Sequence, residues 1–327
     1  MTMTLTFNRQ TLPFRTDFVI AGTQCVLSTN SHDILEAAAR WRPLANHSAV
    51  SSFEMEVIVD PDMNSNHEQP AHFRGNRHLV FGILPPRSFV AYDLLRRRVY
   101  AVLSPAAAND HSFWNKLLLP ITIGVLGTTI GVVPLHCACL HRHGNGVLVA
   151  GVSGAGKSTL ATALAHREFA FVSDDWAYVS KTNSGLLAHG LSFPIKLLPD
   201  ADRFFPELRT LTPKSTLNGE IAYELDPTRS NAFDVKMSTH PRHIFFLERV
   251  SAGGCRMIPC RAEFVRHFFE QNAERLPDEL PEAKALRSSV IQLLSACPSW
   301  VLRTSESPQG TAATLDAFLL EVNRATA

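Results

Sequence analysis

Residues 146–175 read GVLVAGVSGAGKSTLATALAHREFAFVSDD, and this stretch decides the fold. An apolar run enters a glycine-rich loop, a segment rich in alanine and leucine leaves the loop, and a second apolar run ends in two aspartates. Short apolar runs bounded by turn residues are typical of buried strands, and strands that alternate with helices predict an α/β core. We therefore expect a strand, a loop, a helix and a second strand to follow one another here.

The loop in this stretch matches a phosphate-binding motif in full. Residues 151–158 (GVSGAGKS) fit the pattern G-x-x-x-x-G-K-[ST]. Glycines let successive backbone N–H groups turn inward to phosphate oxygens, and the helix that follows adds the positive end of its dipole. We expect Lys157 to reach the β- and γ-phosphates and the Ser158 hydroxyl to bind Mg²⁺. The residues expected to hold the nucleotide are Gly151, Ser153, Gly154, Ala155, Gly156, Lys157, Ser158 and Thr159.

The second apolar run ends in Asp174 and Asp175, a short interval after the loop. The carboxyl ends of the strands in a parallel sheet share one edge, and the phosphate loop also follows the end of its strand. We therefore expect both aspartates to lie beside the γ-phosphate. One carboxylate, for which we choose Asp174, would hold Mg²⁺ with Ser158, and the other would accept a proton from an attacking hydroxyl. The alternative is one structural aspartate beside a helix cap, which explains two carboxylates less well.

The stretch resembles the catalytic domain of bacterial HPr kinase/phosphorylase. The resemblance is carried by Leu135-His136 and by the run of residues 146–175, with its strand, phosphate loop, short helix and Asp-Asp pair. It implies a compact kinase core related to ATP-type phosphoenolpyruvate carboxykinase, and phosphoryl transfer to a serine hydroxyl. Carried over by position, His136 would support or pair with an aspartate, and Asp175 or Asp174 would be the base.

The resemblance covers about residues 131–180 and departs from the family elsewhere. The family signature E-[IV]-R-G-L-G, associated with reverse phosphorolysis, has its nearest counterpart in residues 217–221 (LNGEI), which lack the arginine and the glycine pair. The chain is more similar to divergent relatives that include lasso-peptide precursor kinases. Residues 193–197 (FPIKL) resemble the Pro-Ile-x-Leu-Lys stretch of those relatives. Lys196 is therefore a candidate phosphate or substrate contact, with a solvated lysine as the alternative.

Residues 1–105 have the pattern of a strand-rich N-terminal domain. Turn residues separate several of its apolar segments, which span residues 17–28, 53–60, 78–84, 88–93 and 97–103. Residues 32–41 have helical spacing, and residues 62–75, with His67 and His72, form a polar loop. The predicted fold is α/β, and α+β overall: this N-terminal domain, followed by a P-loop kinase core over residues 106–327.

Composition limits the classes of partner. The chain has 31 Lys and Arg against 30 Asp and Glu, so its net charge of +1 gives no general support for nucleic-acid binding. Six cysteines without a Cys-x-x-Cys pair indicate buried, reduced thiols in a cytoplasmic protein.

The first residues, MTMTLTFNRQTLPF, lack the pattern of a signal peptide. Residues 117–135 carry no charge, but two prolines and the strand that follows favour a buried helix over a membrane span.

The carboxyl-terminal part of the chain supplies the rest of the expected core. Residues 243–248 predict a buried strand whose last residue, Glu248, could join the site, and helices at 262–272, 279–294 and 311–324 would cover the sheet. The predicted function is an ATP- and Mg²⁺-dependent kinase acting on a serine of a peptide or small protein. A small-molecule kinase and a nucleotide-switched binding protein with slow hydrolysis remain the alternatives. Relatives assemble as hexamers, which leaves a homo-oligomer open.

Overall fold

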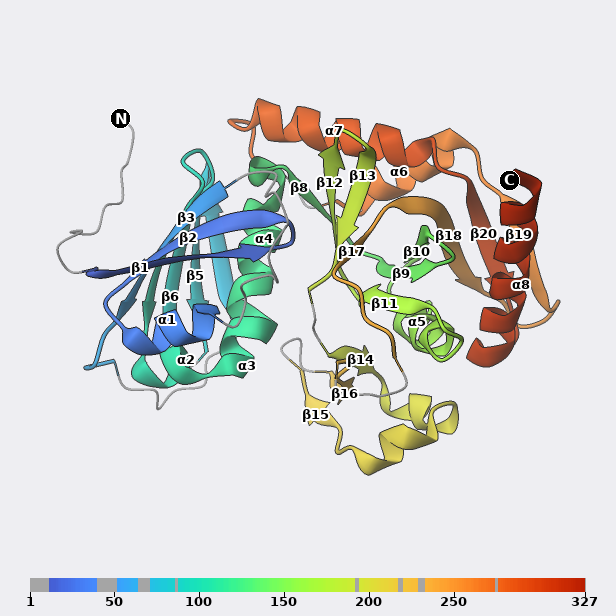
Figure 1. The fold of residues 1–327 in the computed structure, drawn as a ribbon, viewed down its shortest axis with the longest axis horizontal. Coiled ribbons are helices and arrows are strands. Elements are labelled where there is room, and N and C mark those ends of the chain that lie inside the picture. The colour runs from blue at the N-terminus through green and yellow to red at the C-terminus, as the bar shows by residue number, and fades with distance from the viewer. Residues whose placement is uncertain are drawn as a thin grey trace. The chain divides into compact units, whose positions relative to one another are not determined.

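The computed structural model describes residues 12–39, 52–63, 71–85, 88–191, 194–216, 220–228, 233–273 and 276–326. It is a mixed α/β structure with several sheets (Figure 1). The chain divides into two compact units: residues 1–133 with 275–287, and residues 134–274 with 288–327. The first unit thus includes residues 106–133, which the sequence analysis assigned to the second domain.

The first unit is built on a seven-stranded sheet. Its strand order is β1-β2-β3-β7-β6-β5-β4. The strands are β1 (Phe14–Ile20), β2 (Thr23–Thr29), β3 (Ser52–Val59), β4 (His72–Asn76), β5 (Leu79–Leu84), β6 (Ser88–Asp93) and β7 (Arg98–Leu103). Helices α1 (His32–Ala39), α2 (Pro105–Asn109) and α4 (Leu119–Leu126) pack against it.

Two expectations for this unit need correction. Residues 17–28 are not one strand, because the chain reverses at Ala21 and Gly22, which have positive φ angles of 48° and 74°. Two such residues form the tight turn that suits a hairpin, and β1 pairs with β2 in antiparallel register. The expected polar loop at 62–75 ends earlier, since His72 begins β4; His67 lies outside the described residues.

The apolar segment ahead of the core is a helix, as expected. His111–Ile130 is long and apolar enough to cross a membrane by length and composition, and 61% of its most apolar window is buried inside the protein. It consists of α3 (His111–Phe113), the π-helical turn η2 (Trp114–Leu118), α4 and the 3₁₀ turn η3 (Gly127–Ile130). The helix ends at Ile130, and residues 132–135 form strand β8 (Val132–Leu135) instead of continuing it.

The second unit holds a six-stranded sheet of mixed direction. Its order is β11-β9-β10-β18-β20-β19. The strands are β9 (Ala138–Arg142), β10 (Asn145–Ala150), β11 (Ala170–Ser173), β18 (Pro241–Arg249), β19 (Cys255–Pro259) and β20 (Ser299–Thr304). β10 is parallel to β18, but β9 is antiparallel to both β10 and β11. The expected parallel sheet is therefore corrected to a mixed one. Because β9 lies between them, β10 and β11 still run in the same direction and end at the same edge.

The strand ahead of the loop, β10, forms a hairpin with β9. β9 and β10 are joined at His143 and Gly144, both with positive φ. β9 is separated from β8, because β8 stops at Leu135 and β9 starts at Ala138.

Two smaller sheets complete the second unit's strands. One has the order β17-β13-β12-β8 and the other β14-β16-β15. Their strands are β12 (Ala177–Thr182), β13 (Gly185–His189), β14 (Ile195–Leu197), β15 (Lys214–Ser215), β16 (Ile221–Leu225) and β17 (Ser238–Thr239). The chain passes from the four-stranded sheet to the six-stranded one between β8 and β9, and returns between β11 and β12.

Helices supply the rest of this core. α5 (Lys157–Ala165) follows β10, and the later helices are α6 (Ala262–Gln271), α7 (Pro281–Ser295) and α8 (Pro308–Thr326). The three predicted carboxyl-terminal helices are thereby confirmed. α5 packs against α8, and Leu160, Leu164 and Leu315 belong to one buried apolar cluster. All six cysteines are unpaired; Cys25, Cys137 and Cys139 are buried as expected, whereas Cys255, Cys260 and Cys297 are partly exposed.

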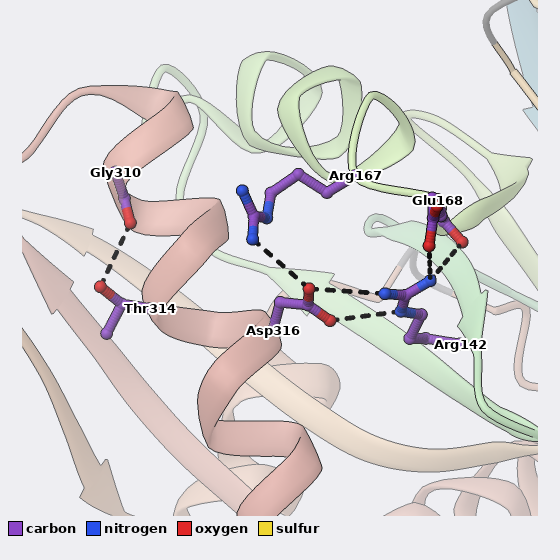
Figure 2. Close-up of polar contacts among 6 residues, drawn as sticks. All are labelled: Arg142, Arg167, Glu168, Gly310, Thr314 and Asp316. Atoms are coloured by element: carbon purple, nitrogen blue, oxygen red, sulfur yellow. Dashed lines mark hydrogen bonds and ion pairs between the residues drawn. The ribbon is translucent and has the colours of Figure 1, made fainter.

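One arginine ties the end of β9 to α8 and to the turn after α5. The Arg142 guanidinium contacts the Asp316 carboxylate at 3.2 and 3.5 Å, and it donates to Glu168 O at 3.0 Å and to Glu168 Oε2 at 3.1 Å (Figure 2). Arg167 adds a longer contact of 3.6 Å to Asp316. Because Asp316 is buried, its charge depends on these partners.

Removing Arg142 should therefore destabilise the protein. Arg142→Ala leaves the buried Asp316 carboxylate with only the distant Arg167, and we expect a loss of about 3 kcal/mol in the free energy of unfolding, measured by urea denaturation. Arg203→Ala is the matched control, because the Arg203–Asp200 pair is exposed on both sides and should contribute less than about 1 kcal/mol. Equal losses in the two variants would contradict this role of Arg142.

Candidate functional site

The loop between β10 and α5 has a backbone that requires glycine. Gly151 has a φ of +152°, and a Cβ there would lie 2.9 Å from the backbone oxygen of Leu247 on β18. Gly156 has a φ of +94° and directly precedes the first residue of α5. The loop therefore starts against β18 and ends at a helix N-terminus. Of the other residues expected to hold a nucleotide, Ser153, Gly154 and Ala155 lie in the loop, and Ser158 and Thr159 lie in the first turn of α5.

Lys157 is folded into this loop. Its side chain is buried, and Nζ donates hydrogen bonds to Gly151 O at 3.1 Å and Val152 O at 3.2 Å. Burial lowers the pKa of Lys157, while the negative charges of Asp175 and Asp174 act in the opposite direction. The loop thus encloses the Lys157 ammonium group, which also interacts electrostatically with both aspartates.

Asp174 lies beside the first turn of α5. Burial raises the pKa of its carboxyl group to about 6, and a hydrogen bond with the Ser158 side chain lowers it in part. The residue as a whole is half-buried, but its Oδ1 atom is buried and has no hydrogen-bond partner within the part of the chain that the structure describes. A hydroxyl and a carboxylate oxygen are ligands that Mg²⁺ accepts, and the unpartnered oxygen is what such an ion would contact. These two residues fit a hard cation.

Asp175 is paired with His136. His136 Nε2 and Asp175 Oδ1 are 3.0 Å apart, and the two side chains are 33% and 52% exposed. The hydrogen bond with His136 lowers the pKa of the Asp175 carboxyl group, against a smaller opposing effect of burial. Both partners therefore remain accessible to a substrate, and the carboxylate is ionised at neutral pH.

The pairing depends on two tight turns. Trp176 N donates to Asp174 O at 2.7 Å, which closes a three-residue turn around Asp175, whose φ is +65°. Cys137 N donates to Leu135 O at 2.9 Å and closes a similar turn around His136. Non-glycine residues with positive φ are strained and persist where the surrounding structure holds them.

These turns lie side by side because of the sheet order. One joins β8 to β9 and the other joins β11 to β12. β9 is the neighbour of β11 in the six-stranded sheet, and β8 is the neighbour of β12 in the four-stranded sheet. The two chain segments therefore cross between the same two sheets at the same place, which brings His136 and Asp175 together.

Lys196 acts on the cluster through its charge, whereas Glu248 is paired outside it, with Arg303. The exposed Lys196 lies on β14, and its charge contributes to lowering the pKa of Asp175. Glu248, at the end of β18, instead makes a two-pronged ion pair with Arg303 of β20, with contacts of 3.0 to 3.2 Å.

Two neighbours of the site were missed by sequence reasoning. The indole of Trp176 stacks on the His136 ring, with centroids 5.3 Å apart and an interplanar angle of 22°. Cys137 is buried close to Lys157; burial raises the pKa of its thiol to about 12, and the lysine charge lowers it in part. The position of Trp176 directly after the Asp-Asp pair was a signal in the sequence, but nothing in the sequence placed its ring against His136.

Comparisons with known proteins gave matches among solved structures only. The sequence matches no protein-family model. It also matches no curated protein. Among solved structures, the chain is similar to the Hpr(Ser) kinase/phosphatase from Coxiella burnetii, with 14% identity and a TM-score of 0.31 over 58% of this chain and 98% of that chain.

The His136–Asp175 contact makes a prediction about pH. In the protein without nucleotide or metal, His136→Ala should raise the pKa of the Asp175 carboxyl group towards its ordinary value, because the main cause of its lowering is removed. Carboxyl-carbon NMR titration measures this directly. The contact stabilises the folded state above the ordinary pKa of aspartate, and that stabilisation is lost as the pH falls through the lowered value.

The matched control for this titration is His166→Ala. His166 forms a similar contact, 2.8 Å from Glu207, at the other end of α5. Its removal should leave the pKa of Asp175 unchanged. An unchanged Asp175 titration in His136→Ala would show that the 3.0 Å contact has no electrostatic effect.

Proposed function

We propose that this protein is an ATP- and Mg²⁺-dependent kinase that transfers the γ-phosphoryl group to a serine hydroxyl of a peptide or small protein. The observation that carries the proposal is the convergence of Lys157, Ser158, Asp174 and the His136–Asp175 pair at one edge of the six-stranded sheet. A kinase needs a cation for the phosphates, oxygen ligands for a metal, and a carboxylate for the acceptor hydroxyl. The cluster offers one group for each task.

The loop and the start of α5 would hold the nucleotide phosphates. Backbone N–H groups of the loop and the positive end of the α5 dipole favour anions. The Lys157 ammonium, which donates to two loop carbonyls, would exchange those acceptors for phosphate oxygens. Ser158 and Asp174 would hold Mg²⁺, which when bound neutralises charge on the β- and γ-phosphates.

Asp175 would accept the acceptor's proton. Its carboxylate is accessible, is oriented by His136, and is ionised at neutral pH. In the transfer, the serine oxygen forms a bond to the γ-phosphorus, the bond from that phosphorus to the bridging oxygen of ATP breaks, and the hydroxyl proton passes to Asp175. The products are the phosphoserine and ADP. General-base help of this kind contributes about 10²- to 10⁴-fold to the rate.

That the acceptor is a peptide or small protein follows from the resemblance to HPr kinases. Val152, in the loop that binds Lys157, is 67% exposed, and Leu198, two residues beyond Lys196, is 51% exposed. Exposed apolar side chains that are scattered singly are ordinary on protein surfaces, so these two residues do not choose between a peptide and a metabolite. That serine is the hydroxyl follows from the resemblance to HPr kinases.

Lys157→Ala should weaken ATP binding. The ammonium is the cation that the loop encloses, and we expect the affinity for Mg²⁺-ATP to fall about tenfold to hundredfold, measured by isothermal titration calorimetry. Lys181→Ala is the control, since this exposed lysine lies on β12. Undiminished binding by Lys157→Ala would overturn the assignment of the loop.

Asp175→Asn should abolish transfer while leaving ATP binding largely intact. The assay uses ATP labelled in the γ-phosphate, with cell lysate and with peptides encoded by neighbouring genes as acceptors. Glu248→Gln, at the end of a neighbouring strand but paired with Arg303, should transfer at the wild-type rate. Transfer by Asp175→Asn at a near wild-type rate would refute the base assignment.

The destination of the label separates the proposed function from its rivals. Label on a serine of a peptide or protein supports the proposal. Label on a small molecule would indicate a metabolite kinase on the same core. Label found only in inorganic phosphate would indicate a nucleotide-switched binding protein that hydrolyses ATP slowly.

A further inference from the structure

Trp176 contacts both partners of the His136–Asp175 pair. Its indole stacks on the His136 imidazole at 5.3 Å between ring centroids, with planes 22° from parallel. Its backbone N–H donates to Asp174 O at 2.7 Å and closes the turn that holds Asp175 at a φ of +65°. The indole is therefore the part of this residue that orders the histidine, whereas any residue other than proline would donate the same backbone hydrogen bond.

The stack supplies a constraint that the hydrogen bond alone lacks. A contact between His136 Nε2 and Asp175 Oδ1 fixes the distance between two atoms, but the partly exposed imidazole can still rotate about its side-chain bonds. An aromatic ring lying parallel to the imidazole restricts that rotation, because offset stacking is favourable only for a limited set of ring planes. The indole therefore restricts the plane of the imidazole, and within that plane the contact with Asp175 selects the flip in which Nε2 faces the carboxylate.

Core packing alone does not account for the placement of Trp176. The Trp114 side chain is fully buried in the first unit, as expected of a tryptophan that fills a core. Trp176 is only half-buried, and it lies next to the exposed Asp175. The half-buried Trp300 packs against the buried apolar cluster of the second unit, whereas Trp176 is not among the residues of that cluster and its ring lies against His136 instead.

We propose that Trp176 is a positioning residue for phosphoryl transfer: its indole fixes the ring plane of His136, so that the histidine holds the Asp175 carboxylate ready for the acceptor hydroxyl. This inference rests on the proposed kinase function. Trp176 acts through His136 and Asp175 and is not itself assigned to the reacting atoms. Small displacements of a catalytic group cost about 10²-fold in rate, so the loss of the stack should be visible in kcat.

The test compares Trp176→Leu with Trp176→Phe. The leucine keeps apolar volume but removes the ring, and we expect kcat to fall about 10- to 100-fold with the KM for ATP changed by less than about twofold. The phenylalanine retains a planar ring and should restore kcat to within about threefold of the wild type. Thr182→Ala, at the far end of β12, is the control and should leave kcat unchanged.

A readout that does not depend on activity accompanies the kinetics. Ring currents of the indole should shift the NMR signals of the His136 ring protons upfield in the wild type, and the shift should disappear in Trp176→Leu. Identical His136 signals in the wild type and Trp176→Leu would overturn the stack itself, whatever the kinetics show.

The kinetic outcomes separate this inference from the function on which it rests. A wild-type protein that transfers no phosphate refutes the kinase, and the positioning role with it. A wild type that transfers phosphate, with Trp176→Leu equal to it, refutes only the positioning role. A phenylalanine variant as impaired as the leucine variant would also refute it, because the planar ring would then not be the feature that matters.

Discussion

The site depends on one topological constraint: the chain crosses between the same two sheets twice, at neighbouring positions. Because β8 lies beside β12 and β9 lies beside β11, the segments that join them must run side by side. His136 is in one crossing and the Asp174-Asp175 pair in the other. The antiparallel β9 also makes β10 and β11 end at one edge, so the same pair lies next to the loop that holds Lys157.

The crossing gives two adjacent carboxylates opposite surroundings. Asp174 turns towards α5 and Ser158, where burial raises its pKa, whereas Asp175 turns towards His136, which lowers its pKa. The proposed division of work, with Asp174 holding the metal and Asp175 accepting the proton, rests on these neighbours. The net charge of the whole chain is near zero. Within the site, the positive charges of Lys157 and Lys196 interact with the negative charges of the aspartates.

Local patterns in the sequence were sufficient to predict the loop, the helix after it and the strand that ends in Asp174 and Asp175, because glycine spacing and apolar runs encode these elements directly. They were also sufficient for the three carboxyl-terminal helices. Such patterns could not predict the break between β8 and β9, because Leu135 and Ala138 lie in one apolar run. They could not predict the reversed direction of β9 either, because tertiary pairing decides strand direction. For the same reason the ring of Trp176 could not be placed against His136, and the pairing of Glu248 with Arg303 could not be foreseen.

A crystal structure with Mg²⁺ and a non-hydrolysable ATP analogue would test the central claim most directly. We expect the β- and γ-phosphates to lie against the backbone N–H groups of the loop, with Lys157 Nζ bonded to phosphate oxygens instead of Gly151 O and Val152 O. The metal should contact Ser158 and Asp174. An analogue bound elsewhere, or a Lys157 that keeps its loop contacts while the nucleotide is bound, would contradict the assignment of this loop and of the kinase site built around it.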